Sequence, residues 1–316
     1  MNPDRKILRI CAAALLCAVL VRFLDGYSLT EAQRSRVSAA LVFLGTGRVV
    51  RMEDTVPTQP AEETLPAPTE PLPAVFSLED RSLVEINDTI GVHPDAESLL
   101  LQPLDWKLYG DNPTVLILHT HASESYEKTE NYTESSAYRT LDENYNVISV
   151  GDHLAEILSG QGITVLQDKT LHDYPSYNGS YSNSRKTLAG YLQEYPSIQL
   201  VLDIHRDAMA DSAGNQIGYT VSTEKGTAAK VMLVVGCNNP GWQENAALAV
   251  KLQAQLEKLC PGICRPMSLR KSRFNQDLSP GAILIEMGAA GNTRQEALLA
   301  AEYVAEAILA LAGGTT

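Results

Sequence analysis

From about residue 110 onward, short apolar runs alternate with longer segments whose apolar residues recur every three or four positions. The uninterrupted runs predict buried strands, and the longer spacing predicts helices that bury one face. Strands are predicted at 114–118, 163–166, 198–204, 230–235 and 282–285, and helices at 152–159, 184–193 and 242–259. Thr293 and Glu296 form a capping-box pattern that predicts a last helix. This alternation predicts an α/β domain with a single, mostly parallel sheet and helices on both faces.

A separate apolar run lies near the N-terminus. Residues Ile7–Leu24 are apolar except for Arg9 and Arg22. The charge-free part is shorter than the span of about 20 residues that a membrane helix needs, but arginines near the ends can reach the headgroups. Arg5 and Lys6 favour a cytoplasmic N-terminus, so we predict a single-pass membrane anchor with the rest of the chain exported. A cleaved signal peptide and a buried helix of a soluble protein are the alternatives.

A proline-rich segment follows the anchor. Six prolines lie between Pro57 and Pro73, with acidic residues among them. Proline favours extended backbone and the acids repel one another, which predicts a stiff spacer. The predicted organisation is therefore a cytoplasmic tip, anchor and short helix in 1–51, a linker and connector in 52–109, and a catalytic domain in 110–316.

Composition narrows the class of protein. The chain has 316 residues, of which 44% are hydrophobic and 20% charged, which is typical of a globular protein and excludes a disordered chain or a polytopic membrane protein. Its net charge of −13 makes nucleic acid an unexpected partner. Five cysteines make neither a disulfide framework nor a zinc knuckle. We interpret them as packed thiols, with a bridge between Cys260 and Cys264 as the alternative.

Polar residues occur where three of the predicted strands end. His119 and His121 follow the first strand, His205 follows the strand at 198–204, and Glu286 follows the last strand. Open α/β sheets bind ligands along the edge formed by the carboxyl ends of their strands. We therefore expect these distant segments to converge on one site.

The residue types at this edge suit a catalytic zinc ion. His121 and Glu124 form an H-x-x-E pair, and His205 can supply a third ligand while one position stays open for water. Glu286 can act as the general base that takes a proton from water and passes it to a leaving amine. His119 is either a further ligand or a donor that supports one. The set predicts zinc-dependent hydrolysis of an amide.

Residues beside these ligands are candidates for contacts with substrate. Asp203 and Asp207 flank His205, and either could orient its imidazole or pair with Arg206. The segment 173–184 holds three tyrosines among Asn and Ser, a composition that suits a sugar or peptide surface or a packed Ω loop. The predicted substrate-binding residues are Arg206, Asp207, Tyr177 and Asn178.

A basic stretch lies within the predicted catalytic domain, which is otherwise acidic. It comprises Arg265 and the run Arg270-Lys-Ser-Arg273. The stretch could contact an anionic substrate, or it could pair with acids nearby. The sequence favours neither interpretation.

Several of these motifs occur together in one known family. They are His119-Thr-His121 with Glu124, the loop 177–181, Asp203-Ile-His205-Arg-Asp207, and the segment 274–280 followed by Leu284-Ile-Glu286. Over residues 110–310 the chain resembles stage II sporulation protein P of endospore-forming bacteria. The resemblance implies a zinc-dependent N-acetylmuramoyl-L-alanine amidase that also cuts peptide cross-links. It further implies the phosphorylase/hydrolase-like α/β fold of the zinc amidases of the cell wall.

The resemblance also implies residue roles, partners and a location. His205 and one of His119 and His121 would be zinc ligands, Glu124 would complete the set, and Glu286 would be the catalytic acid and base. The protein would lie in the septal membrane of the mother cell, with its catalytic domain outside the cytoplasm, and would thin septal peptidoglycan during engulfment. Stage II sporulation proteins D and M would be its partners.

Two other functions fit the same residues. A zinc carboxypeptidase or deacylase would use the same ligands on free peptides. Alternatively, a catalytic domain that has lost its activity would serve as a scaffold for a partner hydrolase. The presence of every proposed metal and proton group favours the amidase.

Overall fold

The computed structural model describes residues 74–128 and 138–313. In chain order its elements are η1 (Glu79–Leu83), β1 (Ile86–Asn87), α3 (Ala96–Leu101), β2 (Val115–Leu118), α4 (Val147–Gly160), β3 (Val165–Gln167), α5 (Ser180–Glu194), β4 (Leu200–Asp207), β5 (Thr220–Thr223), β6 (Gly226–Ala229), β7 (Val231–Gly236), α6 (Trp242–Leu259), β8 (Met267–Arg270), η2 (Gln276–Leu278), β9 (Ala282–Ala289) and α7 (Arg294–Leu311). The predicted membrane anchor and the proline-rich spacer lie outside the described residues. None of the described helices is long and apolar enough to cross a bilayer.

Seven strands form one sheet in the order β1-β8-β7-β9-β4-β2-β3. Every neighbouring pair is parallel except β7 and β9, which run antiparallel. The central strands are buried along almost their whole length, which explains why they read as continuous apolar runs. The predicted α/β class and mostly parallel sheet are confirmed.

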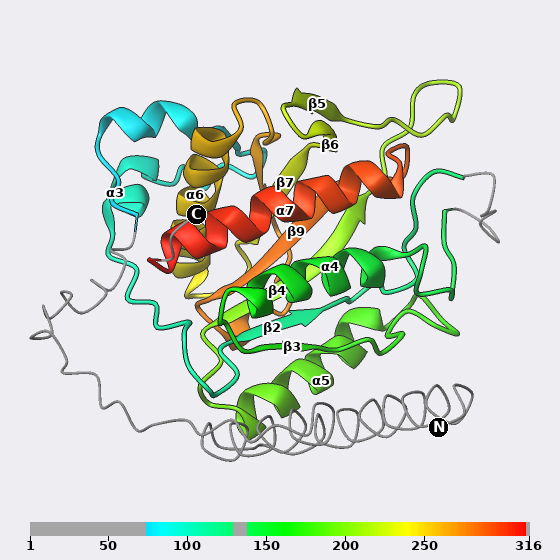
Figure 1. The fold of residues 1–316 in the computed structure, drawn as a ribbon, viewed down its shortest axis with the longest axis horizontal. Helices are drawn as coiled ribbons and strands as arrows, with labels where there is room; N and C mark the ends of the chain where they lie inside the picture. The colour runs from blue at the N-terminus through cyan, green and yellow to red at the C-terminus, as the bar shows by residue number, and fades with distance from the viewer. Residues whose placement is uncertain (1–73, 129–137, 314–316) are drawn as a thin grey trace, which may run out of the picture. The chain divides into compact units, whose positions relative to one another are not determined.

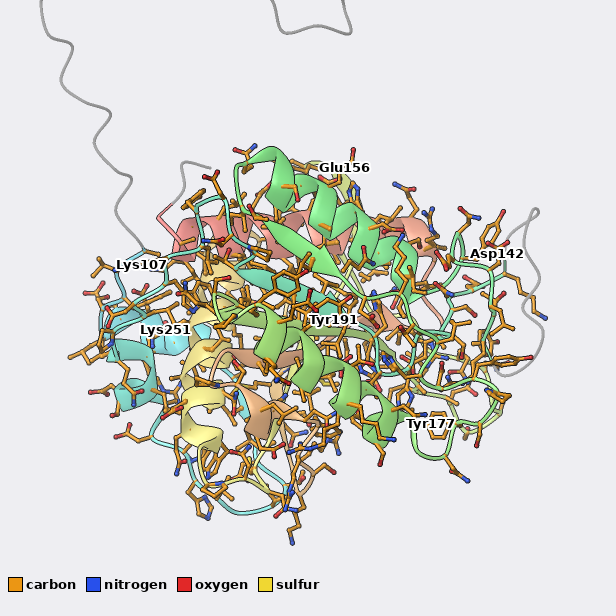
Figure 2. All side chains as sticks on the ribbon, turned by 90° about the horizontal axis from the view of Figure 1, so that it is seen from below. Lys107, Asp142, Glu156, Tyr177, Tyr191 and Lys251 are labelled. Carbon is orange, nitrogen blue, oxygen red and sulfur yellow. The ribbon has the colours of Figure 1, made fainter. Side chains whose placement is uncertain are left out.

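Helices cover both faces of this sheet. Three of them, α4, α6 and α7, pack with one face in the main hydrophobic core (Figure 1). On the opposite face, α5 packs Leu188 against Leu116, Leu118 and Val201 (Figure 2). The predicted capping box of α7 is confirmed, because Thr293 accepts from the Glu296 amide and the Glu296 side chain accepts from the Thr293 amide.

Two strands are longer than the sequence predicts. The predicted ends were residues 204 and 285, but β4 continues to Asp207 and β9 to Ala289. The two strands pair through these extra residues, with a register shift between His205 and Asp207. His205 and Glu286, whose positions in the sequence suggest the ends of strands, therefore lie inside the sheet.

The residues just before position 110 also belong to this body. The sequence analysis placed them in the connector, but in the structure Ile86 pairs with Met267 as the edge strand. Helix α3 buries Leu99 and Leu100 in the main core. Periodicity did not indicate these elements because each is short.

The cysteines of the body are packed thiols. Cys237, Cys260 and Cys264 are all free, and Cys260 is buried. Burial raises the pKa of Cys264 well above its usual value, which keeps this thiol protonated. For these three cysteines the structure agrees with packed thiols and shows no bridge, while Cys11 and Cys17 lie outside the described residues.

The start of β9 depends on a close backbone approach. A Cβ atom at Gly281 would collide with the carbonyl oxygen of Gln199, whereas a Cβ at Gly190 in α5 would meet no atom. We expect Gly281→Ala to destabilise the fold by more than about 2 kcal/mol through overpacking. Gly190→Ala should be neutral or stabilising by up to about 1 kcal/mol through helix propensity. Urea unfolding of both variants tests this, and equal midpoints would contradict it.

Candidate active site

His205 and Glu286 are direct neighbours on the two central strands. They are paired in the parallel register of β4 and β9, and Met232 of β7 faces Glu286 from the other side. Side chains of paired residues in a sheet point to the same face and lie about 5 Å apart at the backbone. The sheet itself therefore brings the predicted ligand and the predicted base together.

The loop after β2 is held by backbone hydrogen bonds to the segment at Tyr138 and to the start of α4. The Ser125 amide donates to the carbonyl of Tyr138, and the Val147 amide donates to the carbonyl of Glu124. The loop residues from His119 to Tyr126 are all buried. The position of this loop is thus fixed at both its centre and its exit into α4.

His119 and His121 have different environments. His119 Nδ1 donates to the Ile204 carbonyl at 3.1 Å, and its Nε2 lies 3.2 Å from the amide nitrogen of Gln167, which donates to it. Burial lowers the pKa of His119 to about 4, so the ring is neutral. A Cβ at Gly151 would lie 2.7 Å from this ring, so α4 packs tightly on it. Both ring nitrogens of His119 are therefore occupied by protein partners.

His121 instead faces His205. The two ring centroids are 5.2 Å apart and the ring planes are nearly perpendicular. Tyr177 stacks on His121 at 4.5 Å, and Tyr181 meets it edge-on at 5.4 Å. Burial lowers the pKa of His121 to about 4, and its Nδ1 is buried with no hydrogen-bond partner. This imidazole is neutral, which is the form that binds a metal.

Glu124 is a buried carboxylate among cations. Its oxygens lie 3.4 Å from His205 Nδ1, 3.4 Å from Arg206 and 3.4 Å from Arg139. Burial alone would raise the pKa of Glu124, but the charges of Arg206 and His205 outweigh burial and lower it. Glu124 is therefore ionised and lies beside both His121 and His205.

Asp203 contacts the His205 ring at Nε2, whereas Glu124 contacts it at Nδ1. Asp203 accepts hydrogen bonds from the Thr120 amide at 2.8 Å and the Thr120 hydroxyl at 2.7 Å. Its Oδ1 lies 3.0 Å from His205 Nε2, although the two atoms are not aligned as a hydrogen bond. Burial disfavours a charged imidazole, but Asp203 and Glu124 outweigh burial and hold the pKa of His205 well above its usual value.

Glu286 differs from the other two acids because nothing in the described structure donates to one of its oxygens. Its Oε2 is buried without a hydrogen-bond partner. Burial raises the pKa of Glu286, and the negative charges of Glu124 and Asp207 add to the shift. A carboxyl group in this state can exchange a proton near neutral pH.

In the described part of the chain, three buried side-chain atoms have no hydrogen-bond partner: His121 Nδ1, His205 Nε2, which lies 3.0 Å from Asp203 without alignment, and Glu286 Oε2. Buried polar atoms without partners are rare, and each requires an explanation such as an ion or a catalytic role. Among the described residues, no three His, Cys, Asp or Glu side chains already form a group that could hold a metal. The candidate ligands His121, Glu124 and His205 thus lie next to one another. In this structure Asp203 and Glu124 are paired with His205.

The four predicted substrate-binding residues fall into two groups. Arg206 is buried and donates to the carbonyls of Ser125 and Tyr138, so its guanidinium holds the loop. Asp207 pairs with Arg265 at 2.6 Å. Tyr177 and Asn178 are exposed at the rim, with Tyr177 at the end of the body opposite Lys251 (Figure 2). These two side chains are accessible to solvent.

Sequence reasoning missed Arg139 and Asp173. Arg139 donates to Asp173 at 2.6 Å and to Ser123 at 3.0 Å, and its guanidinium lies 4.8 Å from the centre of the Tyr177 ring. Asp173 also accepts from the Ser123 hydroxyl. Neither residue lies at a motif spacing, so no pattern in the sequence indicated them.

A model of the stage II sporulation protein P family matches residues 45–309. The chain belongs to this family. Stage II sporulation protein P of Bacillus subtilis strain 168 is 32% identical over 212 residues, which cover 62% of this chain and 50% of that protein. The match thus spans about half the length of this curated relative.

Solved structures that resemble this family member are amidases. The CwlD amidase of Clostridioides difficile, in complex with the GerS lipoprotein, is 15% identical, with 63% of this chain and 95% of that chain covered and a TM-score of 0.41. The N-acetylmuramoyl-L-alanine amidase of Clostridium difficile 630 is 17% identical, with 63% and 96% covered and a TM-score of 0.39. Likeness at this level does not establish the reaction of this chain.

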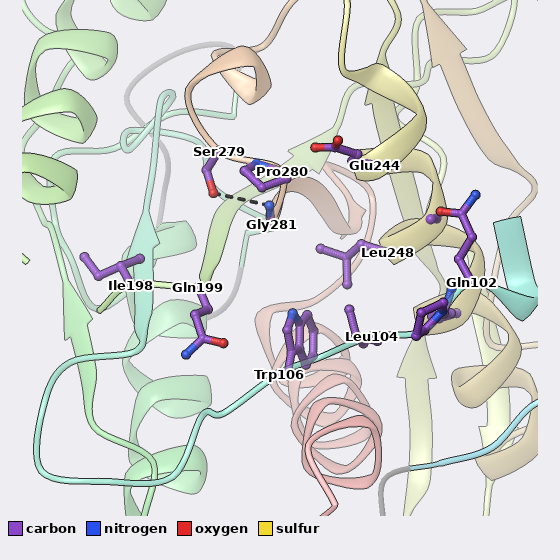
Figure 3. Close-up of a pocket in the computed structure, with 13 residues that line it drawn as sticks. Gln102, Leu104, Trp106, Ile198, Gln199, Glu244, Leu248, Ser279, Pro280 and Gly281 are labelled. Atoms are coloured by element: carbon purple, nitrogen blue, oxygen red, sulfur yellow. Dashed lines mark hydrogen bonds between the residues drawn. The ribbon is translucent and has the colours of Figure 1, made fainter. Parts of the chain in front are cut away.

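A cavity of about 380 Å³ lies at the opposite edge of the sheet in this stage II sporulation protein P family member, where β4 and β9 begin (Figure 3). Leu104, Trp106 and Leu248 face it, and its charged lining residues are Glu244 and Lys251. None of the candidate catalytic residues reaches this cavity. The candidate catalytic residues lie at the other edge of the sheet.

Arg206 is the residue on which the buried position of Glu124 depends. Replacing it by Met would leave the carboxylate without its strongest cation, so we expect Arg206→Met to cost about 3 kcal/mol or more of stability. Arg206→Lys keeps the charge and should cost less. Thermal unfolding at pH 7 measures both. A melting temperature of Arg206→Met within about a degree of the parent would contradict this role.

Proposed function

We propose that this chain is a zinc-dependent peptidoglycan hydrolase that cleaves the amide between N-acetylmuramic acid and L-alanine. The proposal is carried by three buried atoms without a hydrogen-bond partner, on His121, His205 and Glu286. The imidazole of His121 is already neutral, and His205 would release its proton when the ion binds, since metal ligands bind in their deprotonated form. Membership of the stage II sporulation protein P family supports the same assignment.

The donor set fits zinc. His121, Glu124 and His205 would hold the ion through two nitrogens and one oxygen, leaving one position open as catalytic zinc sites do. His119 would stay outside this set, because both its ring nitrogens have protein partners. When bound, zinc supplies polarisation of the scissile carbonyl and activation of water.

Glu286 is the proton carrier in this proposal. Its raised pKa suits a group that must gain and lose a proton at neutral pH. The carboxylate takes a proton from the attacking water and delivers it to the alanine nitrogen as the C–N bond breaks. The products are a carboxylic acid on the sugar side and a free amine on the peptide.

Aromatic residues at the rim suit a sugar–peptide substrate. Tyr177 is 55% exposed and presents one ring face to His121. Asn178 is exposed next to it and offers amide hydrogen bonds. We propose that these two residues contact the substrate, whereas Arg206 and Asp207 act by holding the site together.

Location and partners rest on the family. We propose that the protein is anchored in the membrane by its N-terminal segment, acts outside the cytoplasm on septal peptidoglycan, and works with stage II sporulation proteins D and M. Cleavage of peptide cross-links is part of the same proposal.

Substitutions at His121, His205 and Glu286 test the assignment. The full chain in detergent micelles is incubated with purified sacculi and its products are identified by mass spectrometry. His121→Ala and His205→Ala should lose zinc and activity together. Glu286→Gln should keep zinc and lose about a hundredfold or more in rate, as general acid–base groups do.

His119→Ala is the matched control, because we place it outside the ligand set. It should retain zinc at a stoichiometry near that of the parent. Zinc loss in His119→Ala but not in His121→Ala would overturn the ligand assignment. Release of single amino acids from free peptides, with the sugar–alanine amide intact, would support the carboxypeptidase instead. Bound zinc with no product, even with protein D added, would support the scaffold.

A chelator provides an independent check. Removing zinc should abolish the release of stem peptides from sacculi, and adding zinc back should restore it. Activity that persists after complete metal removal, verified by elemental analysis, would contradict the zinc-dependent mechanism.

A further inference from the structure

A groove of about 350 Å³ begins beside the candidate active site. Tyr181 forms its inner wall, and the same ring meets His121 edge-on at 5.4 Å. Phe274 lies 5.6 Å from Tyr181 and continues the wall outward. A ligand in the groove would therefore contact a residue that touches the candidate ligand His121.

The outer wall of the groove is a loop held in one conformation. Phe274 and Asn275 both have positive φ angles, of 50° and 56°, which residues with side chains rarely adopt. Asn275 Nδ2 donates to the Tyr181 carbonyl and to the Ser184 hydroxyl, both at 3.0 Å. A Cβ at Gly236 would lie 2.7 Å from the carbonyl oxygen of Arg273, so the loop also packs on β7. Such strained backbone persists where the surroundings determine it, and it is common at binding sites.

Two arginines, Arg185 and Arg273, line the groove, and they differ in their ion pairs. Arg185 makes two hydrogen bonds of 2.8 Å to Asp277, so its charge is used within the wall. Arg273 is exposed and forms no direct ion pair among the described residues, although its charge acts on Asp277 from a longer distance. An unpaired arginine in a groove offers a flat pair of donors that matches a carboxylate.

The basic stretch of the sequence therefore divides into two parts. Arg265 pairs with Asp207 at 2.6 Å and stacks over the ring of Tyr219. Arg273, by contrast, lines the groove beside the candidate active site and is exposed. In a chain with a net charge of −13, a cation kept unpaired at such a place favours an anionic ligand.

We propose that this groove is the subsite for the peptide of the substrate, and that Arg273 binds a free carboxylate of that peptide. The inference rests on the proposed function, since a substrate with a peptide beyond the scissile amide is what places a carboxylate there. A peptide that is not joined through its last residue to another chain ends in a carboxylate, and the rings of Tyr181 and Phe274 offer apolar contact to the chain that leads to it. Arg273 is a specificity residue and takes no part in bond breaking.

The test compares two synthetic muramyl peptides that differ only in their last group, a carboxylate or a carboxamide. With the zinc-loaded full chain, we expect kcat/KM to fall about tenfold on the amidated substrate, mainly through KM. Arg273→Gln should lose about tenfold on the carboxylate substrate and almost nothing on the amidated one. Lys271→Gln is the matched control, because Lys271 is exposed on the same loop but does not line the groove, and it should behave as the parent.

A binding measurement separates this inference from the proposed function. Calorimetry with the two free peptides needs no turnover and should show that only the carboxylate form binds more weakly to Arg273→Gln. If this preference appears while neither substrate is cleaved, the proposed function fails and the groove assignment stands. Cleavage of both substrates at equal kcat/KM, or an equal loss on both in Arg273→Gln, would overturn the groove assignment. An unchanged melting temperature of Arg273→Gln verifies its fold.

Discussion

The structure around the site depends on keeping the carboxylate of Glu124 charged inside the protein. Removing a carboxylate from water costs several kcal/mol, which only close cations and hydrogen bonds can offset. Glu124 meets three cationic side chains, from His205, Arg206 and Arg139, each at 3.4 Å. Those three side chains come from a strand and a loop that are far apart in sequence from Glu124. The requirement to neutralise one charge thus joins the loop after β2 to β4 and to the segment at residue 139.

The same strand serves two purposes because its side chains alternate. His205 points to the face where His121 and Glu286 lie, and the next residue, Arg206, reaches the carbonyls of Ser125 and Tyr138. His205 therefore lies beside the candidate catalytic side chains, while Arg206 fixes the loop that carries Glu124. The register shift after His205 lets Asp207 turn outward to Arg265. A slip of one residue in β4 would exchange these roles and separate His205 from Glu286.

This dependence explains what the sequence could and could not predict. Short apolar runs predicted the central strands, and apolar residues at helical spacing predicted the full extent of α6, because burial shapes those segments. His205 and Glu286 were expected after their strands, since polar residues in an apolar run look like an end, yet pairing and ion contacts keep them inside. The pattern could not separate His119 from His121, because only Gln167 and Ile204, which are distant in sequence, distinguish the two rings. Arg139 carried no local signal, because its role comes entirely from partners brought together by the fold.

The three acids of the site show how environment assigns different roles to one functional group. Asp203 accepts two hydrogen bonds from Thr120, and Glu124 lies among cations, so the pKa of each is lowered and each stays ionised. Glu286 is half-buried as a residue, but its Oε2 is buried and has no donor, and its pKa is raised. Acids whose pKa values are driven apart in this way mark which group holds a charge and which moves a proton. That contrast favours Asp203 as an orienting group, Glu124 as a ligand and Glu286 as the proton carrier, and it follows from side chains that share one end of one sheet.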